Sequence, residues 1–296
     1  MADEVEIAAL GVLSGMFRRS EPPAPPAGAV CENCVTLLQG PWCYVCGQEY
    51  GHRRRSVADL AFEAFEGMFH ADGRLWKTLP RLLFRPGTLT RDYVNGKRAP
   101  QAPPFSVFLI VVVLFVFVGG TTGHQSGSSE PVQNPAAPSP AASTFAAADD
   151  SSLAGWIKTR EQVARAQPER FAIVAETWEH RLAIVMLPIS TLILAALFAF
   201  NKRFLVHDHL VFSMHSLAFA GLVLSACMIL ALALGDWAVW LWVLLPIHLF
   251  FHMRGFYRAS VPGTLVRMAF FYVGTSISYV LLLFVLVMFS LAAMTA

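Results

Sequence analysis

Five long stretches of this chain carry no Lys, Arg, Asp or Glu, and they constrain the fold more than any other feature. A helix that crosses a bilayer needs about 20 mainly apolar residues, whereas a soluble core needs no such runs. Charged residues make up 14% of the chain, against about 25% in globular domains. The sequence therefore predicts an all-α, polytopic membrane helical bundle of about five spans. The uncharged stretches are residues 104–123, 182–200, 209–235, 237–253 and 268–296.

Four cysteines near the N-terminus form the strongest chemical motif. Cys31 and Cys34 make one C-x-x-C pair, and Cys43 and Cys46 make a second pair after eight intervening residues. Four thiolates presented from two tight turns form the closed tetrahedral shell that structural Zn²⁺ prefers. The motif predicts a small zinc ribbon with one structural zinc ion. Because this shell leaves no open coordination position, the metal is not expected to be catalytic.

Three other uses of the four cysteines remain open. Two disulfides would require an oxidising compartment. A redox C-x-x-C normally stands alone beside a βαβ pattern. An iron–sulfur cluster also accepts four cysteines.

A basic segment lies between the cysteines and the first uncharged stretch. Residues 53–98 hold ten Lys or Arg against five acids. The spacing of apolar residues predicts helices over about 57–69 and 73–84, and Pro80 is expected to kink or divide the second. A basic helix with Trp76 on its apolar side is suited to the membrane interface, although packing on the ribbon or the other helix is the alternative. The predicted contacts with anionic headgroups are Arg74, Lys77, Arg81, Arg85, Lys97 and Arg98.

Composition also predicts the bounds of the domains. The last of them contains four spans, at about 182–200, 210–234, 237–253 and 268–292, and Pro246 is expected to leave the third of these kinked or incomplete. The predicted domains are a disordered lead with a Pro-rich linker at 1–30, the ribbon at 31–50, the basic amphipathic segment at 51–102, the first span at 103–122, an external loop with a helical second half at 123–181, and the four-span bundle at 182–296.

The placement of basic residues predicts the orientation. Lys and Arg lie before the first span, between the second and third, and between the fourth and fifth, which is one side of the membrane if there are five spans. The positive-inside rule assigns that side to the cytoplasm. We expect a multi-pass protein of the bacterial cytoplasmic membrane, with its N-terminus inside and its C-terminus outside.

Histidines and one aspartate lie at the cytoplasmic ends of the third and fourth spans. Asp208, His209 and His215 belong to the third span, and His248 and His252 to the fourth. A hairpin folded at residues 235–236 sets His215 near the depth of residue 256, with His252 about one turn deeper. Ionisable groups inside a membrane are costly, so this cluster is a candidate second metal or proton site. The alternative is that the histidines bond to backbone carbonyls, to phosphates or to one another.

Several short motifs follow one another along the chain. Together they resemble a bacterial family of multi-pass membrane proteins with an N-terminal zinc ribbon, known only as a domain of unknown function. The chain departs from the family pattern at Asp208, where the family usually has Glu, and at residues 99–101, which lack the usual aromatic. The resemblance implies the fold and no activity. The motifs are Cys31-x-x-Cys34, Cys43-x-x-Cys46-Gly47-Gln48, Arg85-Pro86-Gly87, Gly96-Lys97-Arg98, His209-Leu210-Val211-Phe212 with His215, and Arg254-Gly255-Phe256-Tyr257.

The sequence favours a non-enzymatic membrane protein that docks or assembles a protein partner through the ribbon and the basic segment. Transport of protons, metal ions or a small solute along the Asp/His cluster is the second hypothesis, and a membrane metalloenzyme is the third. No residue is assigned as catalytic, because metalloprotease, nucleotide-binding and hydrolase motifs are missing. Nucleic acid is not an expected partner, since Phe65 and Trp76 fall on the apolar sides of their helices. The sequence does not indicate an oligomeric state.

Overall fold

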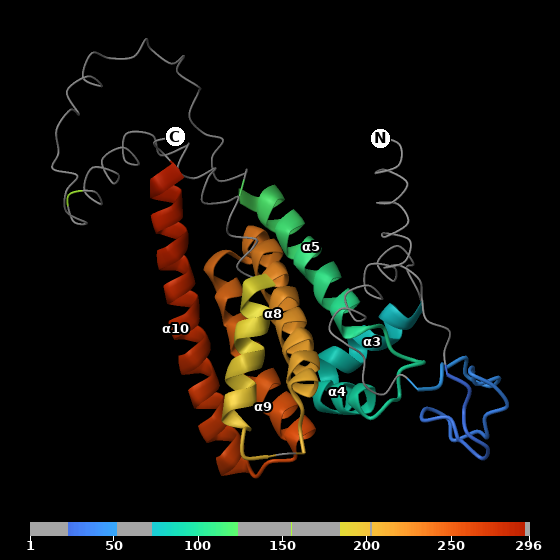
Figure 1. The fold of residues 1–296 in the computed structure, drawn as a ribbon. Helices are drawn as coiled ribbons and strands as arrows, with labels where there is room; N and C mark the ends of the chain where they lie inside the picture. Colours follow the sequence, from blue (N-terminus) through green and yellow to red (C-terminus); the bar gives the residue numbers. More distant parts are fainter. Residues whose placement is uncertain (1–22, 52–72, 124–154, 156–183, 202, 294–296) are drawn as a thin grey trace, which may run out of the picture.

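The structure is a computed structural model that describes residues 23–51, 73–123, 155, 184–201 and 203–293. The predicted helix at 57–69, most of the predicted external loop and the first part of the lead lie outside the described residues. Figure 1 shows a group of long helices with the ribbon beside its lower part.

Helices make up the regular structure of the described part, as the prediction of an all-α bundle requires. Only isolated bridges, Val30 with Leu37 and Trp42 with Glu49, pair extended backbone there. The helices are α3 (Gly73–Phe84), α4 (Pro86–Val94), α5 (Pro104–Gly123), α8 (Val206–Leu234), the 3-10 helix η2 (Gly235–Val243), α9 (Leu244–Tyr257) and α10 (Val261–Ala293), together with a shorter apolar helix at Ile184–Leu197.

Three helices in the described part are long and apolar enough to cross a membrane, and they indicate a membrane protein. They are Pro104–Thr122, Val206–Tyr257 and Val261–Ser290. The second of them comprises α8, η2 and α9, and the chain reverses direction at η2 (Figure 1). Ile184–Leu197, where the second span was predicted, is shorter than the other three.

The predicted fourth span is interrupted, but not by a kink at Pro246. Pro246 lies in the first turn of α9, where the backbone N–H groups are not needed for hydrogen bonds within that helix. The nine residues before α9 form η2 instead. The chain turns back within these residues, and the Sγ atom of Cys227 lies 3.4 Å from the carbonyl of Ala238, so the offset between α8 and α9 is already set at the turn. His252 therefore meets Ser216, about three residues from the position that folding at residues 235–236 predicts.

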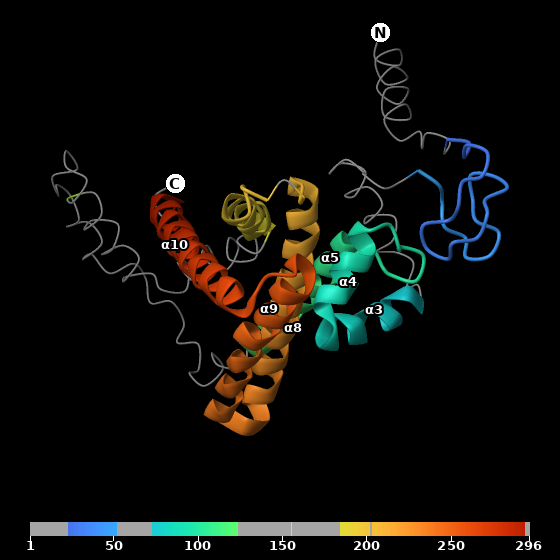
Figure 2. The same cartoon turned by 90° about the horizontal axis from the view of Figure 1, so that it is seen from below.

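The α3–α4 pair packs into the base of the bundle beside α5, α8 and α9, as the view from below shows (Figure 2). At the α4–α9 crossing, a Cβ on Gly87 would lie 2.6 Å from the Cα of Gly255. Only two glycines allow so close an approach of the backbones. Pro86 ends α3 and also begins α4, a helix that the sequence analysis did not predict.

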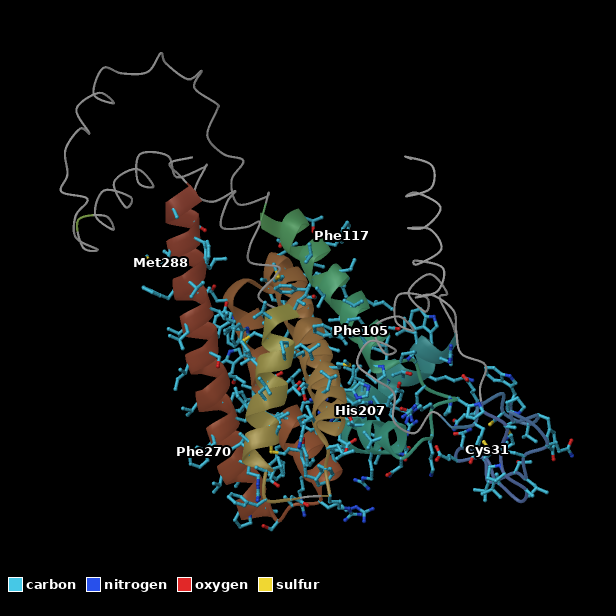
Figure 3. All side chains as sticks on the ribbon, in the orientation of Figure 1. Cys31, Phe105, Phe117, His207, Phe270 and Met288 are labelled. Carbon is cyan, nitrogen blue, oxygen red and sulfur yellow. The ribbon has the colours of Figure 1, made fainter. Side chains whose placement is uncertain are left out.

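The last helix, α10, contributes little to the buried core. Only 6% of its most apolar stretch of 18 residues is buried, and Phe270 on its outer side is 62% exposed (Figure 3). Its base contacts the rest of the bundle through Phe271, which packs in a cluster with Leu194 and Phe198. An apolar helix surface of this kind suits contact with lipid.

Candidate functional site

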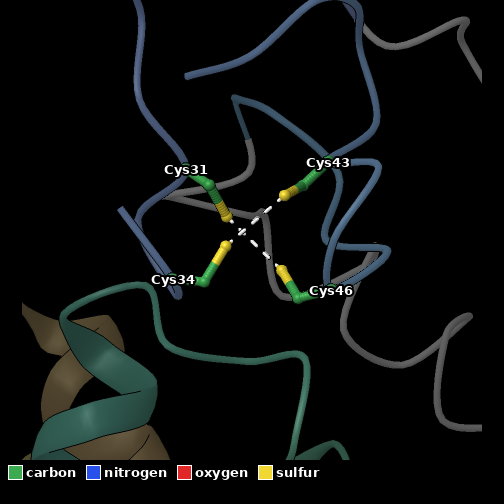
Figure 4. Close-up of side chains that lie close together, drawn as sticks. All are labelled: Cys31, Cys34, Cys43 and Cys46. Atoms are coloured by element: carbon green, nitrogen blue, oxygen red, sulfur yellow. Dashed lines mark hydrogen bonds between the residues drawn. The ribbon is translucent and has the colours of Figure 1, made fainter. Parts of the chain in front are cut away.

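The ribbon consists of two similar turns, each built on one cysteine pair. The amides of Val35 and Gly47 donate hydrogen bonds to the carbonyls of Cys31 and Cys43, at 2.9 and 2.8 Å. The amides of Cys31 and Cys43 in turn donate to the residues five positions later, at 2.8 and 2.9 Å. This repeated geometry aims all four sulfurs toward one point (Figure 4).

The spacing of the sulfurs fits a tetrahedral metal. All four Sγ atoms lie within 4.8 Å of one another. The Sγ atoms of Cys31 and Cys46 are 3.5 Å apart, as are those of Cys34 and Cys43. A zinc–sulfur bond of about 2.3 Å in tetrahedral geometry gives a sulfur–sulfur separation of about 3.8 Å. The cluster is therefore compatible with a metal site, as predicted.

Two of the thiols have opposite electrostatic environments. Burial raises the pKa of the Cys31 thiol to about 12. Hydrogen bonds from the hydroxyl and the amide of Thr36 lower the pKa of the Cys34 thiol to about 6. A divalent cation at the centre would favour the thiolate at both positions, because opposite charge stabilises the ionised form.

One side chain attaches the ribbon to the membrane region. The Nε2 atom of Gln48 donates to the carbonyl of Gly96 at 2.7 Å. The Oε1 atom of Gln48 accepts from the amides of Arg98 and Ala99, each at 3.0 Å. Gly96 has a φ of +93°, and a Cβ there would meet the carboxylate of Glu32. Two motifs of the family resemblance, Cys-Gly-Gln and Gly-Lys-Arg, therefore meet in this contact.

Apolar side chains cover the outer surface of the ribbon. Val35, Tyr44 and Val45 are exposed and lie within or next to the cysteine turns. Val30, Leu37 and Trp42 are also exposed. Figure 3 shows Cys31 to one side of the helices, and the exposure of these side chains shows that the bundle does not cover them.

A second polar site lies in the base of the bundle, where Thr90 of α4 joins two histidines. Its Oγ1 atom is 2.9 Å from Nδ1 of His215 and 2.7 Å from Nε2 of His252. The other ring nitrogen of His252, Nδ1, is 2.9 Å from the hydroxyl of Ser216. Because Thr90 has one hydroxyl proton, it donates to one ring and accepts from the other. Thr90, His215 and His252 are all fully buried.

His248 compensates for a proline. In a continuous helix the carbonyl of Leu82 would accept from the amide of residue 86, but Pro86 has no N–H. The Nε2 atom of His248 lies 2.9 Å from that carbonyl and donates to it. The ring stacks on Phe219 with centroids 3.5 Å apart, which removes its face from other contacts. The deepest of the predicted site histidines thus satisfies an orphaned backbone group.

The predicted Asp/His cluster divides into two parts. His215, His248 and His252 lie together, but Asp208 and His209 lie closer to the start of α8. Asp208 accepts from the amide of Leu205 at 3.0 Å and caps its own helix, and His209 Nδ1 is 2.7 Å from the Tyr257 hydroxyl. Within the described residues the four cysteines are the one group of three or more ligand residues at metal-binding distance.

The predicted headgroup contacts have different surroundings. Arg81 pairs with Asp92, and Arg98 lies over the ring of Tyr93 with its Cζ 5.0 Å from the centroid. Arg74, Lys77 and Arg85 are exposed. Helix α3 buries Leu82 in the bundle but leaves Trp76 and Phe84 75% and 81% exposed. The exposed Trp76 and Phe84 are compatible with the predicted interfacial side, whereas the packing side contacts the bundle rather than the predicted ribbon, and the helix predicted at 57–69 lies outside the described residues. The amide of Lys97 donates to the carbonyl of Asp92 at 2.8 Å, within the turn that receives Gln48.

Two residues that organise these sites were missed from the sequence. Thr90 and Gln48 each make several hydrogen bonds between segments, yet neither belongs to a charged or metal-ligating class. Gln48 had one available signal, since it lies in the Cys-Gly-Gln motif. Thr90 had none.

Comparison with known proteins gives one match. Residues 72–116 match the family model described as a protein of unknown function (DUF3667). These residues include α3, α4 and more than half of α5, which is the segment that Gln48, His215, His248 and His252 contact. The match supports the predicted resemblance to a family of unknown function. No curated protein and no solved structure matches the chain.

Proposed function

We propose that the protein is a non-enzymatic docking protein of a cytoplasmic membrane. In this proposal the ribbon holds one structural zinc ion and presents its apolar surface to a protein partner. Five membrane crossings, including Ile184–Leu197 and the two legs of the α8–α9 hairpin, set the N-terminus and the ribbon in the cytoplasm and the C-terminus outside. The basic residues near the span ends support this orientation.

The backbone of Val35 is the observation that carries the proposal. Val35 has a φ of +62°, in the left-handed region that β-branched residues strongly disfavour. At the corresponding position of the second turn the residue is Gly47, with a φ of +71°. The Val35 side chain is 74% exposed, so packing within the chain does not offset its strain. A strained and exposed apolar side chain is best explained by a contact with another molecule.

The buried histidines support this assignment over transport. Three of the histidine rings are hydrogen-bonded to groups of the fold. The partners are a helix carbonyl for His248, two hydroxyls for His252, and the Tyr257 hydroxyl for His209. The polar groups therefore hold α3, α4, α8 and α9 together. Such use of buried polar groups requires no substrate.

Proton transport remains the second candidate because of one atom. The chain from Ser216 through His252 and Thr90 to His215 ends at Nε2 of His215, a buried nitrogen with no hydrogen-bond partner among the described residues. The test is proton flux into proteoliposomes that contain wild type or His252→Ala. Flux that this variant abolishes, while circular dichroism shows an intact fold, would favour transport over docking.

Two variants of the ribbon separate docking from folding. Val35→Gly removes the apolar contact and relieves the strain, so we expect zinc to be retained and the partner to be lost. Gly47→Ala adds strain to the other turn without removing an apolar side chain, so we expect weaker zinc retention and a retained partner. The measurement is quantitative mass spectrometry of proteins that copurify with each full-length variant from native membranes. Identical partner sets for wild type and Val35→Gly would contradict the proposal.

A further inference from the structure

A pocket of about 120 Å³ lies at the base of the bundle, where α4, α8 and α9 come together. The pocket is lined by three arginines and one acid, Asp208. The arginines are Arg91 of α4, Arg203 of the loop before α8, and Arg258 at the end of α9. The pocket is separate from the ribbon and from the hydrogen bonds of Thr90. A pocket of this volume has room for more than one water molecule and suits a single small polyatomic group.

The arginines of this pocket are not held in ion pairs with other described residues. Asp208 is already engaged, because one oxygen accepts from the amide of Leu205 and the other lies 3.5 Å from Nδ1 of His207. Three arginines thus line a pocket together with one carboxylate that already has other partners.

Arg91 carries most of this argument. Its Nε atom is buried and has no hydrogen-bond partner among the described residues. Burial, together with the nearby charge of Arg258, lowers the pKa of Arg91, and the charge of Asp92 opposes this shift without reversing it. A buried guanidinium N–H without an acceptor is unfavourable, and an anion in the pocket would supply the acceptor.

The backbone of Arg258 is a second, independent observation. Arg258 ends α9 with a φ of +54°, a left-handed conformation that glycine usually adopts at this position of a helix. An arginine here is strained, and it lines the same pocket as Arg91. Planar guanidinium groups bind phosphate through paired hydrogen bonds.

We propose that this pocket binds one phosphate group. The source is either the headgroup of an anionic phospholipid or free phosphate, since both present the same oxygens to the three arginines. The proposal does not depend on docking by the ribbon.

The test uses the full-length protein in detergent and two charge-removing variants. Arg258→Gly removes a pocket guanidinium and relieves backbone strain, so loss of folding does not confound the result. Arg254→Gln removes an exposed charge outside the pocket, at a residue that is not among the predicted headgroup contacts, and is the control. The probes are phosphatidylglycerol, followed by native mass spectrometry, and inorganic phosphate, followed by thermal shift.

We expect saturable binding of one probe to wild type, about tenfold or more weaker binding to Arg258→Gly, and unchanged binding to Arg254→Gln. Saturation by phosphatidylglycerol alone identifies a lipid headgroup, and saturation by inorganic phosphate identifies a free anion; either supports the pocket. Absence of saturable binding to wild type, or equal weakening in both variants, would overturn the proposal.

Discussion

Replacing Thr90 with valine tests whether one hydroxyl joins α4 to the α8–α9 hairpin. Valine keeps the shape and β-branching of threonine but removes the oxygen that lies 2.9 and 2.7 Å from the two histidine rings. Two buried ring nitrogens then lose their partner. Each unsatisfied buried group costs about 1–3 kcal/mol, whereas hydrogen bonds between membrane helices average about 0.6 kcal/mol. We expect a net loss of about 2 kcal/mol.

The assay is thermal unfolding of the detergent-purified protein, followed by tryptophan fluorescence. A loss of about 2 kcal/mol corresponds to a fall in Tm of roughly 4–8 °C for a chain of this size. Thr88→Val on the same helix is the matched control, because the exposed Thr88 hydroxyl bonds only to the carbonyl of Arg85, at 2.8 Å. The control is expected to change stability by less than about 0.5 kcal/mol. Equal Tm values for the two variants would refute the bridging role of Thr90.

Two further predictions concern close contacts. Gly87→Ala should destabilise the protein by about 1–3 kcal/mol, because its Cβ would lie 2.6 Å from the Cα of Gly255. The control Gly120→Ala, whose Cβ meets nothing within 4 Å, should be neutral or stabilising. Equal Tm values for the two variants would contradict this packing. Gln48→Ala removes three hydrogen bonds between the ribbon and residues 96–99. Limited proteolysis should therefore release the ribbon faster than from wild type, while the zinc content stays the same. An unchanged cleavage rate would show that Gln48 does not hold the ribbon in place.

The helices and the cysteine cluster were predictable because strong local rules govern them. Uncharged stretches identify α5, α8 and α10, and the C-x-x-C spacing brings four sulfurs to one point regardless of the rest of the fold. The bounds of α3, Gly73–Phe84, agree with its apolar spacing, and Pro80 is accommodated inside the helix. These features depend on neighbouring residues in the sequence.

The features that were missed depend on contacts between distant segments. Helix α4 is only nine residues long and mostly polar, so no apolar period marks it. The register of the α8–α9 hairpin required knowledge that residues 235–243 form a 3-10 helix. The partner of His248 followed from a rule that the sequence does offer, since Pro86 must orphan the carbonyl of Leu82. Which side chain would satisfy that carbonyl depended on the fold.

Metal analysis of the detergent-purified protein tests the central claim most directly. We compare wild type with Cys43→Ser, because loss of one of four thiolates opens the tetrahedral shell. The account predicts one zinc ion per chain in wild type and none in Cys43→Ser, with the buried histidines free of metal. No zinc in wild type, an iron–sulfur absorbance, or a metal ion retained by Cys43→Ser would contradict it.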